Sequence, residues 1–226
     1  MKMIRFAQTL VLLTALGAVA ALPATAKKDF EEATSADGLE KVKVKNIDLA
    51  YVRPGMTLAP YTKVLIEPVQ VAFRKDFEPT KAGSRMKLTT DELEKIRTDV
   101  GKVVHAEFAK ELAKGSYVTV AAAGPDVLRV RAEIKDLYVN APDTMEPGRT
   151  RTYTMSAGEM TLVMELADSE TDAVLARVYD RREARDTGML SWTNSVTNRM
   201  EAEQAANTWA RILRARLDAA RGIGKK

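Results

Sequence analysis

The chain has 226 residues, with 35 basic and 31 acidic side chains, one histidine and no cysteine. Without cysteine it can form no disulfide, thiol nucleophile, thiolate metal site or lipidated cysteine anchor. The formal net charge of +4 falls to +2 when Lys2 and Arg5 are set aside with the N-terminal segment, and so small an excess disfavours a nucleic-acid-binding surface. The length suits one domain with a sizeable core.

Residues 1–26 are typical of a secretory signal peptide. Two basic residues precede an apolar run over 6–22, and the Ala-Thr-Ala motif at 24–26 has the A-x-A form of a cleavage site. We expect cleavage after Ala26, a periplasmic or secreted product and no integral membrane span after cleavage. A membrane anchor is the alternative, but the polar residues within the run and the small residues at its end suit a cleaved segment better.

Residues 27–38 are charged and small, so we expect a flexible leader before a single domain over 39–226. Two short alternating segments follow, at 42–44 and 47–51. They predict a weak edge strand and then a loop.

A strong strand is predicted over 61–73, because apolar and polar residues alternate there. The alternation slips by one residue at Pro68, which indicates a β-bulge at an edge or a break in pairing. Thr89 and Glu92 then form a capping box, and apolar residues at three- and four-residue spacing predict a helix that ends near Lys114.

The second half of the chain predicts mainly strands. Segments 117–120 and 127–139 alternate in the manner of strands with one buried face. Residues 160–166 and 174–178 predict an antiparallel hairpin across a polar turn. A long amphipathic helix is expected over 195–221.

This order of elements predicts an α+β fold in a single domain. We expect a mostly antiparallel sheet of about five to six strands with two long helices packed on one face, since that arrangement buries every apolar stripe. No internal repeat is visible.

The sequence assigns no catalytic residue, no metal ligand and no cofactor. His105 is the single histidine, and it lies on the flank of the predicted first helix, far in sequence from other candidate partners. Five strand carboxylates could supply a glycosidase pair. These are Glu67, Glu133, Asp136, Glu165 and Asp180. Salt bridges to strand arginines are the competing interpretation.

The candidate binding residues are Arg181, Arg182 and Arg185, which cluster at the end of the predicted hairpin, and Trp192. Guanidinium groups suit phosphate and carboxylate ligands, whereas the alternative is a salt-bridged exposed face. Trp209 belongs to the apolar stripe of the last helix, so we expect it in the core.

Several segments together resemble the bacterial family known as domain of unknown function 3313. They are residues 51–55, 61–73, 125–129 and 168–182, with Trp209, Leu213 and Leu217. The resemblance implies an exported protein, often a lipoprotein, although this chain lacks the lipobox cysteine. It implies no activity and no catalytic residue. Where the family tends to have Thr-Gly, this chain has Thr171 and Asp172, a change that a left-handed turn position tolerates.

Three functional hypotheses remain open. We favour a non-enzymatic envelope protein that binds a protein partner or helps to assemble a complex. The second is a module that binds an anion, a glycan or a small molecule through the arginine cluster. The third is a carboxylate-dependent hydrolase. The sequence does not indicate the oligomeric state.

Overall fold

The computed structural model describes residues 22–78, 87–139, 153–154, 158–183, 191–192 and 195–223. In chain order its elements are α1 (Leu22–Ala36), β1 (Glu40–Val42), β2 (Leu49–Val52), β3 (Lys63–Ile66), β4 (Gln70–Phe73), α2 (Thr90–Ala113), β5 (Val118–Thr119), β6 (Val127–Val139), β7 (Tyr153–Thr154), β8 (Gly158–Asp168), β9 (Val174–Glu183), β10 (Ser191–Trp192) and α3 (Ser195–Ala220).

Eight of these strands form one mixed sheet in the order β1-β2-β9-β8-β6-β3-β5, with β4 also paired to β6. The expectation of about five to six mostly antiparallel strands is therefore wrong in the number of strands, and it did not include the parallel pairs. Strands β3 and β4 run parallel to β6, and β5 runs parallel to β3. Helix α2 provides the crossover that parallel pairing requires, and it returns the chain to run in the same direction.

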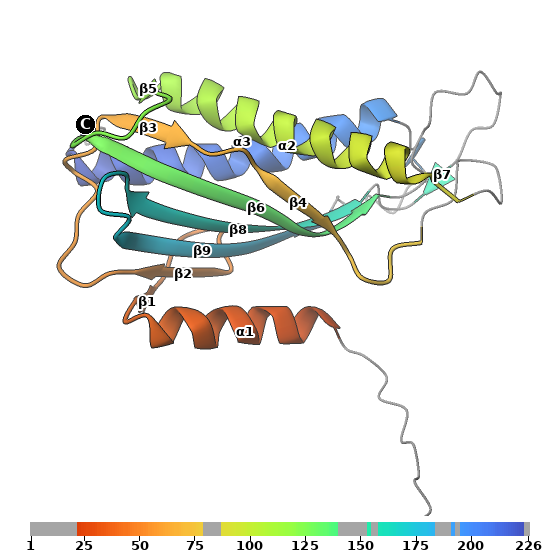
Figure 1. Ribbon diagram of the computed structural model, residues 1–226, viewed down its shortest axis with the longest axis horizontal. Helices are drawn as coiled ribbons and strands as arrows, with labels where there is room; N and C mark the ends of the chain where they lie inside the picture. The colour runs from red at the N-terminus through yellow and green to blue at the C-terminus, as the bar shows by residue number, and fades with distance from the viewer. Residues whose placement is uncertain are drawn as a thin grey trace, which may run out of the picture.

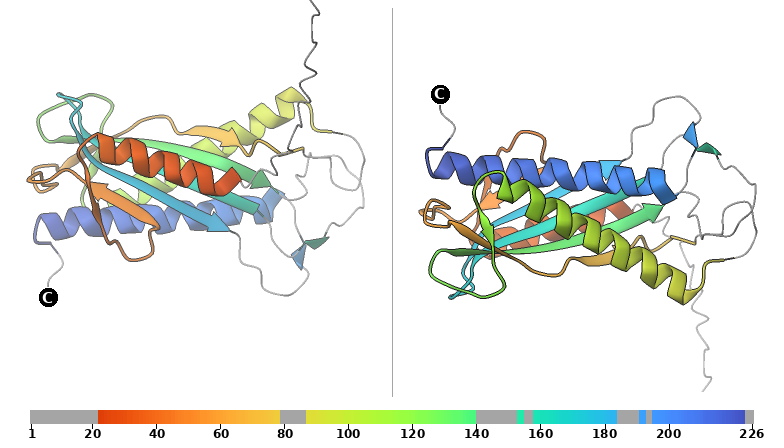
Figure 2. Two further views of the ribbon diagram at one scale, coloured as in Figure 1. Left: turned by 90° about the horizontal axis from the view of Figure 1, so that it is seen from below. Right: turned by 90° about the horizontal axis from the view of Figure 1, so that it is seen from above.

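Two helices cover one face of the sheet and a third lies on the other (Figure 1). Helices α2 and α3 pack together on the first face, as predicted, while α1 on the opposite face was not expected. Figure 2 shows α2 and α3 close together at the C-terminal end of α2 and apart at its N-terminal end. At the close end, Arg214 Nη2 of α3 forms an ion pair with Glu111 Oε1 of α2 at 3.2 Å.

The main core lies between the sheet and these two helices. It includes Val104, Phe108 and Leu112 of α2, Leu128, Val130 and Ile134 of β6, and Trp209, Leu213 and Leu217 of α3, all buried. The stripes identified in the sequence thus face the sheet. Trp209 is 1% exposed, which confirms its predicted place in the core.

Local signals in the first half of the chain are confirmed. The Thr89 hydroxyl accepts a hydrogen bond from the Glu92 backbone N–H, and the Glu92 carboxylate accepts one from the Thr89 N–H. The strand predicted over 61–73 is divided at Pro68 into β3 and β4, both paired with β6. Ile66 lies opposite Val130 and Gln70 opposite Glu133, so the register slips by one residue.

Helix α1 occupies most of the segment expected to be a flexible leader. The Phe30 ring packs against Tyr51 and Tyr179, at centroid distances of 6.0 and 5.5 Å. Glu31 also binds Lys41 at 2.8 Å, and Asp37 binds Arg177. These partners are remote in sequence, so the local composition of the segment could not indicate them.

The predicted hairpin is present as β8 and β9. The Asp168 carboxylate accepts hydrogen bonds from the backbone N–H groups of Glu170 and Thr171, an arrangement that closes the turn. Asp172 has φ 60°, so the position is left-handed, as the family comparison of Thr-Gly with Thr-Asp implied.

Candidate binding site

An open groove lies where the β1–β2 hairpin meets the end of β9. It has a volume of about 860 Å³ and is lined by residues 41–48 and 180–182. Strand β2 begins at Leu49, opposite Tyr179, so the last residues of β9 have the hairpin loop beside them in place of a paired strand. The groove lies between this loop and the end of β9.

Hydrogen bonds from β9 hold the loop in place. The Asp48 backbone N–H donates to Asp180 Oδ1 at 2.9 Å, and Asp48 Oδ2 accepts from the Arg181 N–H at 3.1 Å. Arg182 Nη2 donates to the Asn46 carbonyl at 2.7 Å. Asn46 adopts a left-handed conformation with φ 62°, which asparagine tolerates better than most residues. The loop is therefore positioned by tertiary contacts as well as by its own turn.

Asp180 connects the groove to the core. Its side chain is 4% exposed, and Oδ2 accepts from Trp209 Nε1 at 2.7 Å and from Arg182 Nε at 2.6 Å. Burial raises the pKa of the Asp180 carboxyl, while the hydrogen bond from Trp209 and the charge of Arg182 act in the opposite direction. This carboxylate orients the Arg182 guanidinium toward the loop.

The groove carries more positive than negative charge. Its lining has five cationic side chains, Lys41, Lys43, Lys45, Arg181 and Arg182, and two carboxylates, Asp48 and Asp180. Lys43 and Lys45 are exposed, and neither makes a hydrogen bond or ion pair with another residue in the part of the chain that the structure describes. These two ammonium groups remain available to an anion.

The other cations of the groove are partly committed. Lys41 binds Glu31 of α1 at 2.8 Å. Arg181 Nη2 lies 2.8 Å from both Glu159 and Glu183. The electrostatic excess of the groove therefore comes chiefly from the loop lysines and from Nη1 of Arg182, the guanidinium nitrogen with no partner in the described part of the chain.

Two of the four binding residues predicted from sequence lie at this groove. Arg181 and Arg182 line it, while Arg185 lies outside the described residues. Trp192 belongs to β10, which pairs with β7, and its side chain is not among those described. Lys43 and Lys45 were not among the predicted binding residues, although their alternation with valine is visible in the sequence.

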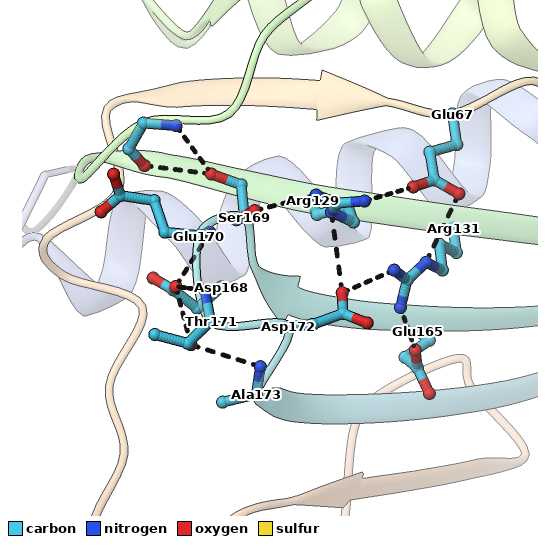
Figure 3. Close-up of polar contacts among 11 residues, drawn as sticks. Glu67, Arg129, Arg131, Glu165, Asp168, Ser169, Glu170, Thr171, Asp172 and Ala173 are labelled. Carbon is cyan, nitrogen blue, oxygen red and sulfur yellow. Dashed lines mark hydrogen bonds and ion pairs between the residues drawn. The ribbon is translucent and has the colours of Figure 1, made fainter.

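A second polar cluster covers the sheet face opposite α2 and α3. We call it the arginine ladder, and it consists of Arg129, Arg131, Arg177, Glu67, Glu165, Asp172 and Asp37. Figure 3 shows Arg131 at its centre, in contact with carboxylates from three segments. Its contacts are Glu67 at 3.4 Å, Glu165 at 3.0 Å and Asp172 at 2.5 Å.

The arginine ladder neutralises its own charge, since three arginines face four carboxylates. The hydrogen bond to Asp172 raises the pKa of Arg131 further above its usual value. Arg177 links Glu165 to Asp37 at the end of α1, so the ladder also fastens that helix. Such a network fits the salt-bridged face that the sequence analysis weighed as the alternative to a binding site.

The five strand carboxylates fall into structural positions. Glu67 and Glu165 both bind arginines of the ladder, Glu133 lies 3.2 Å from Lys135, and Asp180 forms the floor of the groove. Asp136 has φ 51° at a register shift of β6.

His105 is half-buried and makes no hydrogen bond within the described ranges. Within those same ranges, no three acidic or histidine side chains are grouped so as to hold a metal ion. None of the described helices combines the length and the apolar character that crossing a membrane requires.

Three solved structures match the chain at low identity and with TM-scores below 0.5. The PelC dodecamer from Paraburkholderia phytofirmans is 12% identical with a TM-score of 0.41, over 73% of this chain and 96% of that chain. A DUF330 protein from Xanthomonas campestris is 11% identical with a TM-score of 0.39, over 76% and 91%. A DUF4136 protein from Bacteroides thetaiotaomicron is 11% identical with a TM-score of 0.36, over 80% and 97%. Scores below 0.5 carry no functional inference.

The sequence comparisons give the family but no activity. No curated protein matches the chain. The model described as "Protein of unknown function (DUF3313)" matches residues 31–213, which include the groove, the arginine ladder and most of the core. The chain belongs to the DUF3313 family.

Proposed function

We propose that this protein is an exported, non-enzymatic binding module of the cell envelope, and that the basic groove is its contact surface for an anionic partner. The observation that carries the proposal is that Lys43 and Lys45 line the groove together with Arg182 and have no partner among the residues that the structure describes. Export is supported by the signal-peptide pattern of residues 1–26.

The groove suits contact at short range. The field of an exposed charge is screened within about 8 Å at physiological ionic strength, so an anionic group must enter the groove to gain much from its cations. Asp48 and Asp180 lower the excess charge further. We therefore expect binding that weakens as salt is added.

The arginine ladder is a poorer candidate for the same role. An incoming anion would have to displace carboxylates that already satisfy the guanidinium groups, such as Glu165 between Arg131 and Arg177. Removing one partner of a half-buried pair leaves the other without compensation. The loop lysines carry no such cost.

The test uses defined polyanions and a matched pair of charge reversals. The exported protein should be retained on a polyglutamate peptide, on a sulfated polysaccharide or on vesicles that contain phosphatidylglycerol. Lys43→Glu with Lys45→Glu should abolish that retention, and raised salt should weaken it in the parent protein. Lys75→Glu with Lys102→Glu is the control, because it reverses the same number of charges at two exposed lysines that do not line the groove.

Two results would contradict the proposal. One is equal loss of retention in the control and in the groove variant, which would indicate non-specific charge. The other is the absence of salt-sensitive retention on all three polyanions. Export is tested separately, since N-terminal sequencing of the exported protein should begin at Lys27.

A further inference from the structure

We infer that the groove takes a phosphoryl group in preference to a carboxylate, and that Asp180 is the positioning residue that sets this preference. The inference rests on the proposed function, because it names the ligand chemistry of the same groove. A free phosphate, a phosphorylated glycan and a lipid with a phosphomonoester headgroup all present this chemistry.

Two of the three guanidinium nitrogens of Arg182 already have hydrogen-bond partners. Planar two-point recognition of a carboxylate needs two neighbouring N–H groups of the guanidinium. In this groove Nε donates to Asp180 Oδ2 at 2.6 Å and Nη2 donates to the Asn46 carbonyl at 2.7 Å. Each of the two forks of the guanidinium thus contains a nitrogen that is already engaged. Among the described residues, Nη1 has no partner.

Lys43 and Lys45 are ammonium groups on long flexible side chains, and they act as point charges without a planar geometry of their own. They come from the loop, whereas Arg182 comes from β9, and all three line the groove. The available donors therefore belong to two separate segments and to three separate side chains.

Donors arranged in this way match a tetrahedral oxyanion. A phosphoryl group has three terminal oxygens that point in different directions, and at neutral pH a monoester carries a charge between −1.5 and −2, roughly. A carboxylate has one charge and two coplanar oxygens. The phosphoryl group can therefore contact Nη1 and both ammonium groups at once, which a single carboxylate does less well.

Asp180 acts on this selectivity through Arg182 and does not itself contact the ligand. Its carboxylate occupies Nε, and it is fixed in turn by Trp209 Nε1 and by the Asp48 N–H. Asparagine has one carbonyl oxygen, which can still accept from Trp209, but its NH2 group then faces the Asp48 N–H, and the charge that attracts Arg182 is lost. Arg182 then keeps one of its two anchors, the bond from Nη2 to the Asn46 carbonyl, and with the other anchor lost the guanidinium can turn to present a complete fork to a carboxylate.

The experiment compares two dianions on the exported protein. Inorganic phosphate and malonate are titrated calorimetrically at pH 7.5 and constant ionic strength. We expect phosphate to bind at least tenfold more tightly, which is about the effect of one charged hydrogen bond. Lys43→Gln with Lys45→Gln should weaken phosphate binding about tenfold or more, whereas Lys102→Gln should leave it unchanged.

The role of Asp180 has its own measurement. Asp180→Asn should lower the ratio of phosphate to malonate affinity, and a loss of structure alone would weaken both ligands equally. If that variant does not fold, Arg182→Lys serves instead. It keeps the charge without the planar fork, so the preference for phosphate should persist.

Other outcomes separate this inference from the proposed function. Equal affinities for phosphate and malonate, both dependent on Lys43 and Lys45, would overturn the phosphoryl inference and leave the binding function standing. So would retention on polyglutamate without any binding of phosphate. Failure of every polyanion overturns both.

Two further arms identify the source of the phosphoryl group. Tighter binding to vesicles that contain phosphatidic acid than to soluble glycerol phosphate supports a lipid headgroup. The reverse order supports a soluble or glycan phosphate.

Discussion

Asp172 shows how one residue can combine an unfavourable backbone with a favourable charge. Its φ of 60° is a conformation that glycine adopts freely and other residues adopt at a cost. Its carboxylate compensates by contacting Arg131 at 2.5 Å. The pair is partly exposed, with the Asp172 side chain 57% accessible, so the attraction is modest.

This balance predicts that two small substitutions of Asp172 will differ in their effect on stability. Asp172→Gly should stay within about 1 kcal/mol of the parent, because relief of the backbone offsets the lost ion pair. Asp172→Ala should be about 1 to 2 kcal/mol less stable than the glycine variant, since it loses the charge and keeps the strain. Urea unfolding measures both. If the alanine variant proves as stable as the glycine variant, the left-handed assignment is wrong.

Ionisation of Tyr61 should lower the stability of the folded protein at alkaline pH. Burial raises its pKa to about 12, and the hydrogen bond that its hydroxyl donates to Asp168 acts in the same direction. In the unfolded chain the group ionises near pH 10, roughly. The folded protein favours the neutral hydroxyl, so this contribution is complete below about pH 10 and is lost as the pH rises toward 12.

Tyr61→Phe tests that dependence. The variant should lose less stability than the parent between about pH 10 and 12, because it has no hydroxyl to ionise at this site. Burial also raises the pKa values of Tyr51, Tyr117 and Tyr179, so a smaller alkaline loss should remain in both proteins. Identical slopes of stability against pH in the two proteins would contradict the assignment.

At the scale of elements, α1 is attached by few contacts and should be the easiest helix to detach. Phe30 is half-buried, so Phe30→Ala should cost about 1 to 3 kcal/mol, less than for a fully buried ring. Hydrogen exchange in α1 should accelerate while α2 and α3 stay protected. Glu32→Ala is the control, because Glu32 forms only an exposed pair with Lys28 at 3.6 Å. Equal acceleration in all three helices would contradict separate attachment.

Elements that depend on nearby residues could be predicted from sequence, and those that depend on distant partners could not. The capping box at Thr89 and the slip at Pro68 are local patterns, and both are confirmed. Parallel pairing of β3 and β4 with β6 depends on how α2 returns the chain, which alternation does not reveal. Helix α1 depends in the same way on Tyr51 and Tyr179.

The candidate site divides along the same line. Arg181 and Arg182 were visible as a cluster of charge in the sequence, and both line the groove. Lys43 and Lys45 gain their place only because Asn46 and Asp48 are bonded to β9, more than a hundred residues away. A charged residue on a predicted edge strand is ordinarily a protection against aggregation, so the local pattern did not mark these two lysines as binding residues.

At the scale of the whole molecule, the sheet separates two environments. One face holds the apolar core beneath α2 and α3, and the other holds the arginine ladder and α1 (Figures 1 and 3). Asp180 lies where the core meets the groove, since its Oδ2 accepts hydrogen bonds both from Trp209 of the core and from Arg182 of the groove. The stability of the core and the geometry of the groove therefore share one carboxylate.

This sharing predicts two distinct effects at Trp209. Trp209→Ala should destabilise the protein by about 3 to 5 kcal/mol, because it leaves a large cavity between α3 and the sheet. Trp209→Phe should keep most of the packing and cost about 1 to 3 kcal/mol, since it removes one hydrogen bond from the buried Asp180 carboxylate. Urea unfolding gives both values. If both variants unfold at the same urea concentration as the parent, Trp209 neither fills the core nor supports Asp180.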